Sequence, residues 1–277
     1  MNPAVGMAAL WAVFVSTHIG LTTRAIRARL VERLGEWGFS LTFSGVAIIL
    51  FAIVVQYYAA HRGSGPLGLG LADVWAARVG LMAVIVLGIA LIGGSFATYF
   101  RSPYALHSRR PIDGPYGLER ITRHPFLAGV ALMGIAHALL ARWMVGTVFS
   151  LGLATLAVFG SMHQDRKLLA RKGAAYAAYL RATSAIPFAA IAAGRQRLVA
   201  RELPVTALAS GVAIAIALRA VHDSIFASGG AWMIGVVTGS VALIALQTRL
   251  QARRRRGKRV FSSLSSESGE ATFHGRP

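Results

Sequence analysis

Cysteine is absent from the 277 residues of this sequence, which excludes disulfides, thiolate metal sites and cysteine nucleophiles. Charged side chains are scarce as well, at 14% of the chain, whereas soluble domains carry roughly a quarter. Hydrophobic residues make up 55%, and the mean hydropathy is +0.58. This composition is typical of an integral membrane protein rather than a soluble domain.

Acidic residues are the rarer of the two charged groups. Only 10 Asp and Glu stand against 29 Lys and Arg, which gives a net charge of +19. Most of the arginines flank long apolar runs, so they fit anionic lipid headgroups better than nucleic acid. The Walker, G-x-S-x-G and H-E-x-x-H motifs of soluble enzymes are also missing. We therefore expect the lipid bilayer as the main partner and no nucleic acid.

Seven apolar runs approach the roughly 20 residues that a membrane-spanning helix needs. They are 3–21, 38–59, 74–98, 124–141, 143–162, 203–221 and 229–248. The predicted fold class is all-α, a polytopic membrane bundle of about seven transmembrane helices. We expect residues 1–200 to form a five-helix membrane domain and 201–252 to add two transmembrane helices. Residues 253–277 read as a basic, disordered cytoplasmic tail.

Basic residues gather in alternate loops, after the first, third, fifth and seventh apolar runs. By the positive-inside rule these loops are cytoplasmic, with the N-terminus outside and the C-terminus in the cytoplasm. In the first basic loop, Ile26, Leu30 and Leu34 recur every four residues between arginines. This spacing predicts an amphipathic helix on the cytoplasmic surface. The expected location is a bacterial inner membrane.

Four histidines are candidates for function, because ionisable residues in membrane helices are costly. His18, in the first apolar run, is either an interfacial histidine bonded to a carbonyl, or a ligand or acid–base group that faces the bundle interior. His137, deep in the fourth run, is either a ligand or a neutral histidine bonded to a neighbouring helix. His124 stands at the start of the fourth run, and His163 lies just after the fifth, two residues before Asp165.

Helix geometry separates two of these histidines. His124 and His137 lie about 20 Å apart along one helix and about 140° apart around it. They therefore cannot bind one metal ion together. In the predicted topology, His18 lies near the cytoplasmic side and His137 nearer the outside.

Three segments in this order resemble the NnrU family of integral membrane proteins. They are STHIGLTTRAIRARLVERLGEWGFSLTFSGVAI, GPYGLERITRHPFLAGVALMGIAHAL and MHQDRKLLARKGAAYAAYLRATSAIPF. The family includes zeta-carotene isomerases of plants and algae, and bacterial NnrU proteins linked to nitrogen-oxide respiration. The resemblance covers about residues 5–190.

The resemblance implies a b-type haem between membrane helices, with His18 and His137 as its iron ligands. It also implies redox-dependent cis-to-trans isomerisation of a hydrophobic polyene such as a carotenoid, or a role in denitrification with an unidentified electron donor. We expect supporting roles for Arg123, His124, His163, Asp165 and Arg166. No residue is assigned as catalytic.

Two other functions stay open at this point. Membrane methyltransferases that act on isoprenylcysteine share R-H-P near a helix start and a later G-x-x-Y-x-x-Y before proline. In that case Tyr116, Arg123 and His124 would help hold S-adenosylmethionine, while Gly173, Tyr176, Tyr179 and Pro187 match the rest of the outline. The other possibility is a non-enzymatic accessory protein of a respiratory complex.

Overall fold

The structure is a computed structural model. It describes residues 2–105, 112, 114–240 and 242. The chain divides into two compact units, Met1–Met233 and Ile234–Pro277, and the fold and site below belong to the first. The predicted tail 253–277 lies outside the described residues.

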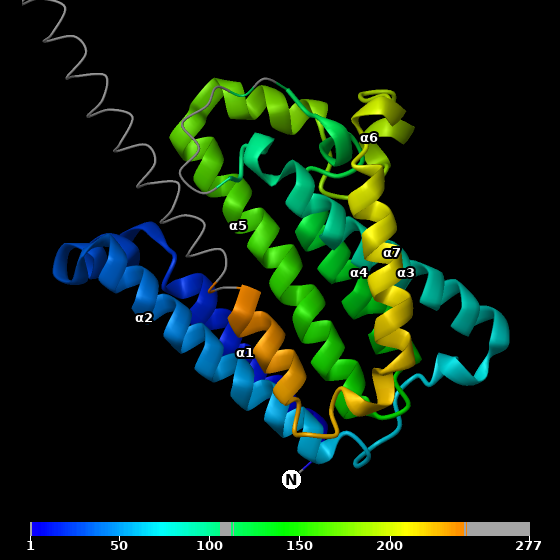
Figure 1. Ribbon diagram of the computed structural model, residues 1–277. Helices are drawn as coiled ribbons and strands as arrows, with labels where there is room; N and C mark the ends of the chain where they lie inside the picture. The colour runs from blue at the N-terminus through cyan, green and yellow to red at the C-terminus, as the bar shows by residue number, and fades with distance from the viewer. Residues whose placement is uncertain (1, 106–111, 113, 241, 243–277) are drawn as a thin grey trace, which may run out of the picture. The chain divides into compact units, whose positions relative to one another are not determined.

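Helices form the regular structure of the described chain (Figure 1). The long ones are α1 (Pro3–Gly20), α2 (Arg24–His61), α3 (Trp75–Thr98), α4 (Pro125–Leu140), α5 (Met144–Ala182) and α7 (Val205–Ala220). The short elements are α6 (Ala189–Ala192), η1 (Leu71–Asp73), η2 (Tyr99–Arg101), η3 (Gly117–Arg120), η4 (Ala200–Glu202) and η5 (His222–Ser224). The predicted all-α class is therefore confirmed for the described residues.

Four helices, α1, α2, α3 and α5, are long and apolar enough to cross a membrane. The shorter apolar helices are α4, α7 and residues Ala231–Ser240. Many large side chains on these helices are apolar yet exposed, among them Leu41, Ile49 and Trp75, at 65%, 61% and 71%. Such surfaces suit lipid rather than water. The count of seven spans and the orientation stay predictions.

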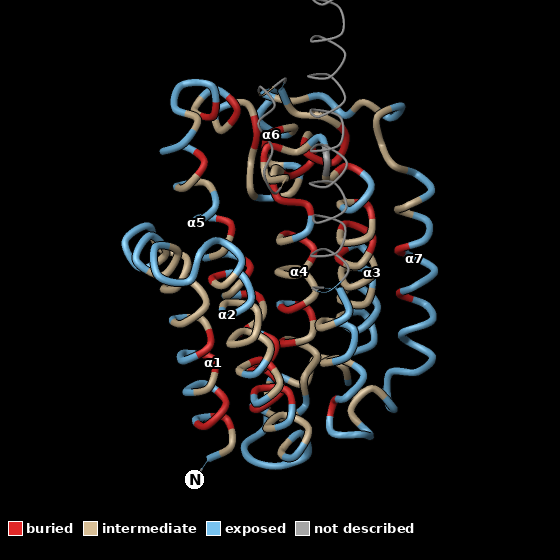
Figure 2. The backbone as a smooth tube through the Cα atoms, turned by 60° about the vertical axis from the view of Figure 1, so that its left-hand side comes forward, coloured by how far each residue is buried: buried red, intermediate tan, exposed pale blue. Residues whose placement is uncertain are grey.

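Helix α5 is the central helix of the first unit. Half of its apolar window is buried, compared with 22–28% for α1, α2 and α3. It packs against α1 and α4, while α3 packs against α4 and α7. Figure 2 shows the buried residues following α4 and α5, with exposed residues along α7.

Glycines allow the helices to approach closely, as is common in membrane bundles. A Cβ atom on Gly129 of α4 would lie 2.4 Å from the carbonyl oxygen of Gly88 on α3. One on Gly134 would lie 2.7 Å from the carbonyl oxygen of Ser150 on α5. At both crossings only glycine lets the helix backbones meet at this distance.

Two glycines with positive φ interrupt the longest helices. Gly35, at φ 70° and ψ 169°, separates residues 24–34 from the rest of α2. Gly173, at φ 55° and ψ −130°, separates the last turns of α5 from residues 144–172. The helix axis changes direction at each break, because these angles are not helical.

The two ends of the helix bundle are identified by contacts between distant segments. At the hairpin end, the Gly68 amide donates to the Arg142 carbonyl at 2.8 Å, between α4 and α5. A Cβ atom on Gly65 would lie 3.2 Å from Pro3, so α1 begins at this end. The opposite end holds the contacts of Asp165, and we name it the Asp165 end.

Candidate functional site

Asp165 accepts hydrogen bonds from four side chains. Oδ2 accepts from Nε of Arg123 at 2.9 Å. Oδ1 accepts from the hydroxyls of Tyr176 and Tyr104 at 2.6 and 3.1 Å, and lies 2.9 Å from Nε2 of His124. The side chain of Asp165 is only 14% exposed. A guanidinium and several donors around one buried carboxyl group favour its ionised form.

The partners of Asp165 come from three separate segments of the sequence, one of them the last part of α5, which holds Tyr176. Asp165 lies on α5, which continues past the predicted end of the fifth apolar run at residue 162. Arg123 and His124 come from the turn before Pro125, and Tyr104 comes from the segment after α3. The cluster therefore joins the start of α4 to the middle of α5.

Tyr176 reaches Asp165 because α5 is broken between them. In a straight helix, eleven residues would separate the two Cα atoms by about 16 Å along the axis. The break at Gly173 turns the last part of α5, so that the Tyr176 hydroxyl comes within 2.6 Å of Oδ1. The ring of Tyr176 is fully buried.

A second buried polar pair lies beside this cluster. Glu119 and Tyr179 are 4% and 3% exposed. Among the described residues, neither Oε1 of Glu119 nor the Tyr179 hydroxyl has a hydrogen-bond partner. Burial raises the pKa of Glu119, and burial likewise raises the pKa of Tyr104 well above its ordinary value. Both groups therefore favour their neutral forms.

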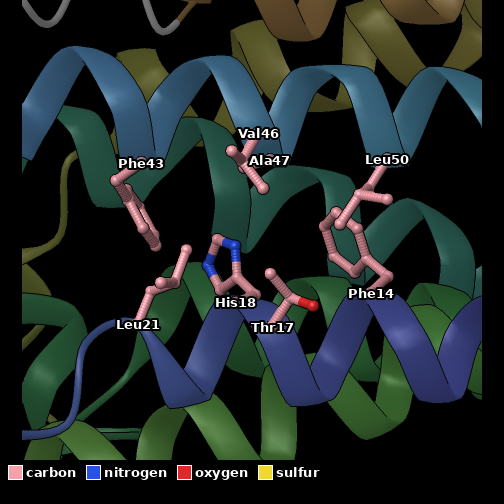
Figure 3. Close-up of a pocket in the computed structure, with 8 residues that line it drawn as sticks. All are labelled: Phe14, Thr17, His18, Leu21, Phe43, Val46, Ala47 and Leu50. Atoms are coloured by element: carbon pink, nitrogen blue, oxygen red, sulfur yellow. The ribbon is translucent and has the colours of Figure 1, made fainter. Parts of the chain in front are cut away.

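His18 lies in an apolar crevice between α1 and α2. Figure 3 shows its ring beside Phe43; the ring centroids of His18 and Phe43 are 4.9 Å apart, and those of His18 and Phe14 are 5.4 Å apart. The crevice is lined by Phe14, Thr17, His18, Leu21, Phe43, Val46, Ala47 and Leu50. Nδ1 of His18 is buried and has no hydrogen-bond partner in the described part of the chain. It is therefore an unpaired buried nitrogen among the described residues.

His137 lies at the other end of the bundle. It is near the last turn of α4, where its Nδ1 lies 2.8 Å from the Met133 carbonyl. Its ring stacks with that of His222 at 6.2 Å between centroids. His18 is near the last turn of α1, some 22 Å along that helix from Pro3 at the hairpin end. The structure does not bring His18 and His137 together.

The haem implied by the sequence resemblance can be tested on this geometry. Two axial nitrogens on one iron lie about 4 Å apart, twice a metal–nitrogen bond of roughly 2 Å. His18 and His137 do not fit this requirement in the described arrangement of helices. His18 by itself offers one requirement of a single haem ligand, an imidazole nitrogen without a hydrogen-bond partner beside apolar side chains. The described residues contain no group of three or more His, Asp or Glu that could hold a metal ion.

The supporting residues named from the sequence divide into two groups. Arg123, His124 and Asp165 meet in one cluster, as described above. His163 instead lies with Nε2 3.1 Å from the Thr22 hydroxyl, and Arg166 is exposed. Tyr104, in the segment after η2, and Glu119, in η3, were not among the residues predicted from the sequence.

Comparisons with known proteins identify the family to which this chain belongs. The model of the NnrU protein family matches residues 6–229. The chloroplastic 15-cis-zeta-carotene isomerase of Arabidopsis thaliana is 32% identical over 207 residues, covering 71% of this chain and 53% of that protein. The Zea mays enzyme is 30% identical over 203 residues, covering 70% and 52%. This chain thus spans about half the length of these curated relatives. No solved structure matches it. The chain belongs to the NnrU family.

Proposed function

We propose that this protein is a membrane isomerase that converts a cis carbon–carbon double bond of a carotenoid-like polyene to trans. The observation that carries the proposal is the 32% identity over 207 residues to a 15-cis-zeta-carotene isomerase. The alignment covers 71% of this chain, so it includes most of the helical unit. The substrate class is proposed from these relatives.

The surface of the protein suits such a substrate. A carotenoid is almost entirely hydrocarbon and dissolves in the bilayer, and the long helices expose apolar side chains to that phase. Isomerisation rotates one double bond and neither adds nor removes atoms. The protein therefore needs an apolar contact surface and a means of weakening the double bond, but no water or leaving-group chemistry.

Haem b bound at His18 forms part of the proposal. When bound, it would supply a redox-active iron next to the apolar crevice. Phe14 and Phe43 flank the His18 imidazole and exclude water from it. Thr17 and Leu21, one residue before and three after His18, line the same crevice. These residues hold the ring in an apolar environment, where a hydrophobic substrate could approach.

The Asp165 cluster has a positioning role in this proposal. Its donors are bonded to Asp165 itself, and Arg123 Nη1 is also 3.4 Å from the Thr183 carbonyl. We assign to it the alignment of α4 with α5, and no step of the isomerisation.

The test uses the whole chain in bacterial cells engineered to accumulate 15-cis-zeta-carotene. Pigments are extracted in the dark and their isomers separated by chromatography. We expect the protein to raise the fraction of the 15-trans isomer, and the His18→Ala variant to lose this effect while still accumulating in the membrane. An unchanged isomer ratio with well-folded protein would reject the isomerase. Changed growth on nitrate in the same strains would favour the respiratory role instead.

A further inference from the structure

The first eleven residues of α2 form a separate helical arm, residues 24–34. The break at Gly35 ends the arm, and in Figure 1 it leaves the line of the rest of α2. The arm begins at the Asp165 end, since Thr22, just before it, contacts His163 of α5. It is too short to span a membrane, which takes about 20 residues.

One side of the arm is apolar and exposed. Ile26 is 41% exposed and Leu34 is 46% exposed, and Leu30 lies between them on the same helical face. Trp37, just past the break, is 51% exposed. Tryptophan is enriched at the boundary between membrane and water, so this face has the composition of an interfacial helix.

The arm carries more positive than negative charge. Arg24, Arg29 and Arg33 are exposed. Of the arginines in the arm, Arg27 forms an ion pair within the described part of the chain, with Glu36 at 2.5 Å. The one acid within the arm is Glu32.

Helix α5 adds to this charge. Lys167 is close enough to Arg27 and Arg171 for their charges to repel its own. Guanidinium groups beside an apolar helical face can reach lipid phosphates while the apolar side chains enter the acyl region. Each such cation favours an anionic surface by about 1 kcal/mol.

We propose that the arm, together with Lys167 and Arg171, is a binding surface for anionic phospholipid. The ligand chemistry is a phosphodiester headgroup with a net negative charge, and phosphatidylglycerol is the form to test. The arm selects this lipid over zwitterionic phosphatidylcholine. The inference does not depend on the isomerase proposal, because it uses neither the His18 crevice nor the Asp165 cluster.

The absence of cysteine makes the test site-specific. The Leu34→Cys variant, labelled with an environment-sensitive fluorophore, is placed in nanodiscs of phosphatidylcholine with a minor fraction of quencher-labelled lipid. We expect quencher-labelled phosphatidylglycerol to associate with the arm on the order of fivefold more strongly than the phosphatidylcholine form, the size expected from one cation. Raising the salt concentration should weaken this preference, since exposed charges are screened.

Two charge-matched variants complete the design. Replacing Arg24, Arg29 and Arg33 with Gln should reduce the preference, since Lys167 and Arg171 remain. The control replaces the exposed arginines of the hairpin end, Arg62, Arg78 and Arg142, with Gln and should keep it.

The proposal would be overturned if the two quencher-labelled lipids quenched the labelled Leu34→Cys protein equally while its arginines are intact. So would an equal loss in both triple variants, because the effect would then come from net charge alone. The salt series needs no arginine variant, so the proposal stays testable if a triple variant does not fold.

Discussion

Tyr176 donates a 2.6 Å hydrogen bond to Asp165, a residue eleven positions earlier on the same helix. This contact exists only because Gly173 interrupts α5 between them. The same carboxyl group accepts from Arg123 at the start of α4. A backbone break and a buried acid therefore act together to hold two helices at the Asp165 end.

Gly173→Ala should lower the stability of the protein. At φ 55° and ψ −130°, a side chain would be strained by about 1–3 kcal/mol. Space is not the cause, because no described atom lies within 4 Å of a Cβ atom built there. We expect a lower midpoint in thermal denaturation of the detergent-solubilised protein.

Gly160→Ala is the matched control for this variant. Gly160 is also on α5 and has open space around it, but its φ is not positive. Alanine is favoured over glycine in a helix by up to about 1 kcal/mol, so this variant should be neutral or more stable. Equal effects of the two substitutions would show that backbone strain at Gly173 is not the cause.

Asp165→Asn should be more harmful than its small change of shape suggests. It removes the negative charge that faces the Arg123 guanidinium and replaces one acceptor oxygen by an NH2 donor, and losing one partner of a buried ion pair costs up to about 3–5 kcal/mol. Asp73→Asn, at an exposed turn, should change stability little. Thermal denaturation and limited proteolysis near α4 would measure both. A stability equal to that of Asp73→Asn would show that the cluster contributes nothing to the fold.

The helices at the centre of the fold could be predicted because apolar runs of about 20 residues have few alternatives in a membrane. The third run, predicted at 74–98, is Trp75–Thr98 in the structure. The boundary between the fourth and fifth runs, predicted between residues 141 and 143, also matches, since α4 ends at Leu140 and α5 begins at Met144. The fifth run, predicted at 143–162, accounts only for the first part of α5, because the helix continues to Ala182.

The burial of Asp165 in the polar part of α5 could not be predicted, because composition does not reveal burial. The stretch after residue 162 reads as a solvated helix end, yet Asp165 is largely covered by partners from three other segments. Tyr104 is 61 residues from Asp165 in sequence, and only the packed fold brings them together. By contrast, Arg123 and His124 could be named in advance, because Pro125 marks the start of a helix at that point.

Acid should loosen the contact between η3 and η4. Glu202 accepts from Nε of Arg120 at 2.7 Å and from the Gly117 amide at 3.0 Å, and the hydrogen bond from Arg120 lowers the pKa of Glu202 to about 2. A lowered pKa in the folded state means that this contact stabilises the protein above the ordinary value of 4.5 and is lost as the pH falls from there towards 2.

The measurement for this contact is the difference in unfolding midpoint between the protein and its Glu202→Gln variant. We expect that difference to be largest at neutral pH and to shrink between pH 4.5 and 2. Glu32→Gln, an exposed position on the arm, serves as the control and should show no such trend. A difference that does not change with pH would remove Glu202 as the titrating group.

His18→Ala should abolish haem binding if the crevice between α1 and α2 is the binding site. The reason is that Nδ1 of His18 is buried without a partner in the described chain, whereas Nδ1 of His61 lies 2.8 Å from the Tyr57 carbonyl. Absorption spectra of the purified protein, with and without dithionite, should show a Soret band. We expect the band to survive in His61→Ala and to disappear in His18→Ala.

His137→Ala then decides how the second iron ligand is supplied. In the described arrangement His137 stacks with His222 at the hairpin end, too far from His18 to share one iron. We therefore expect this variant to keep the Soret band. If both the His18→Ala and the His137→Ala variants lose the Soret band, the haem-bound protein must have another arrangement of α1 and α4. If haem-supplemented protein shows no Soret band at all, the haem proposal is rejected, while the isomer assay still tests the isomerase independently.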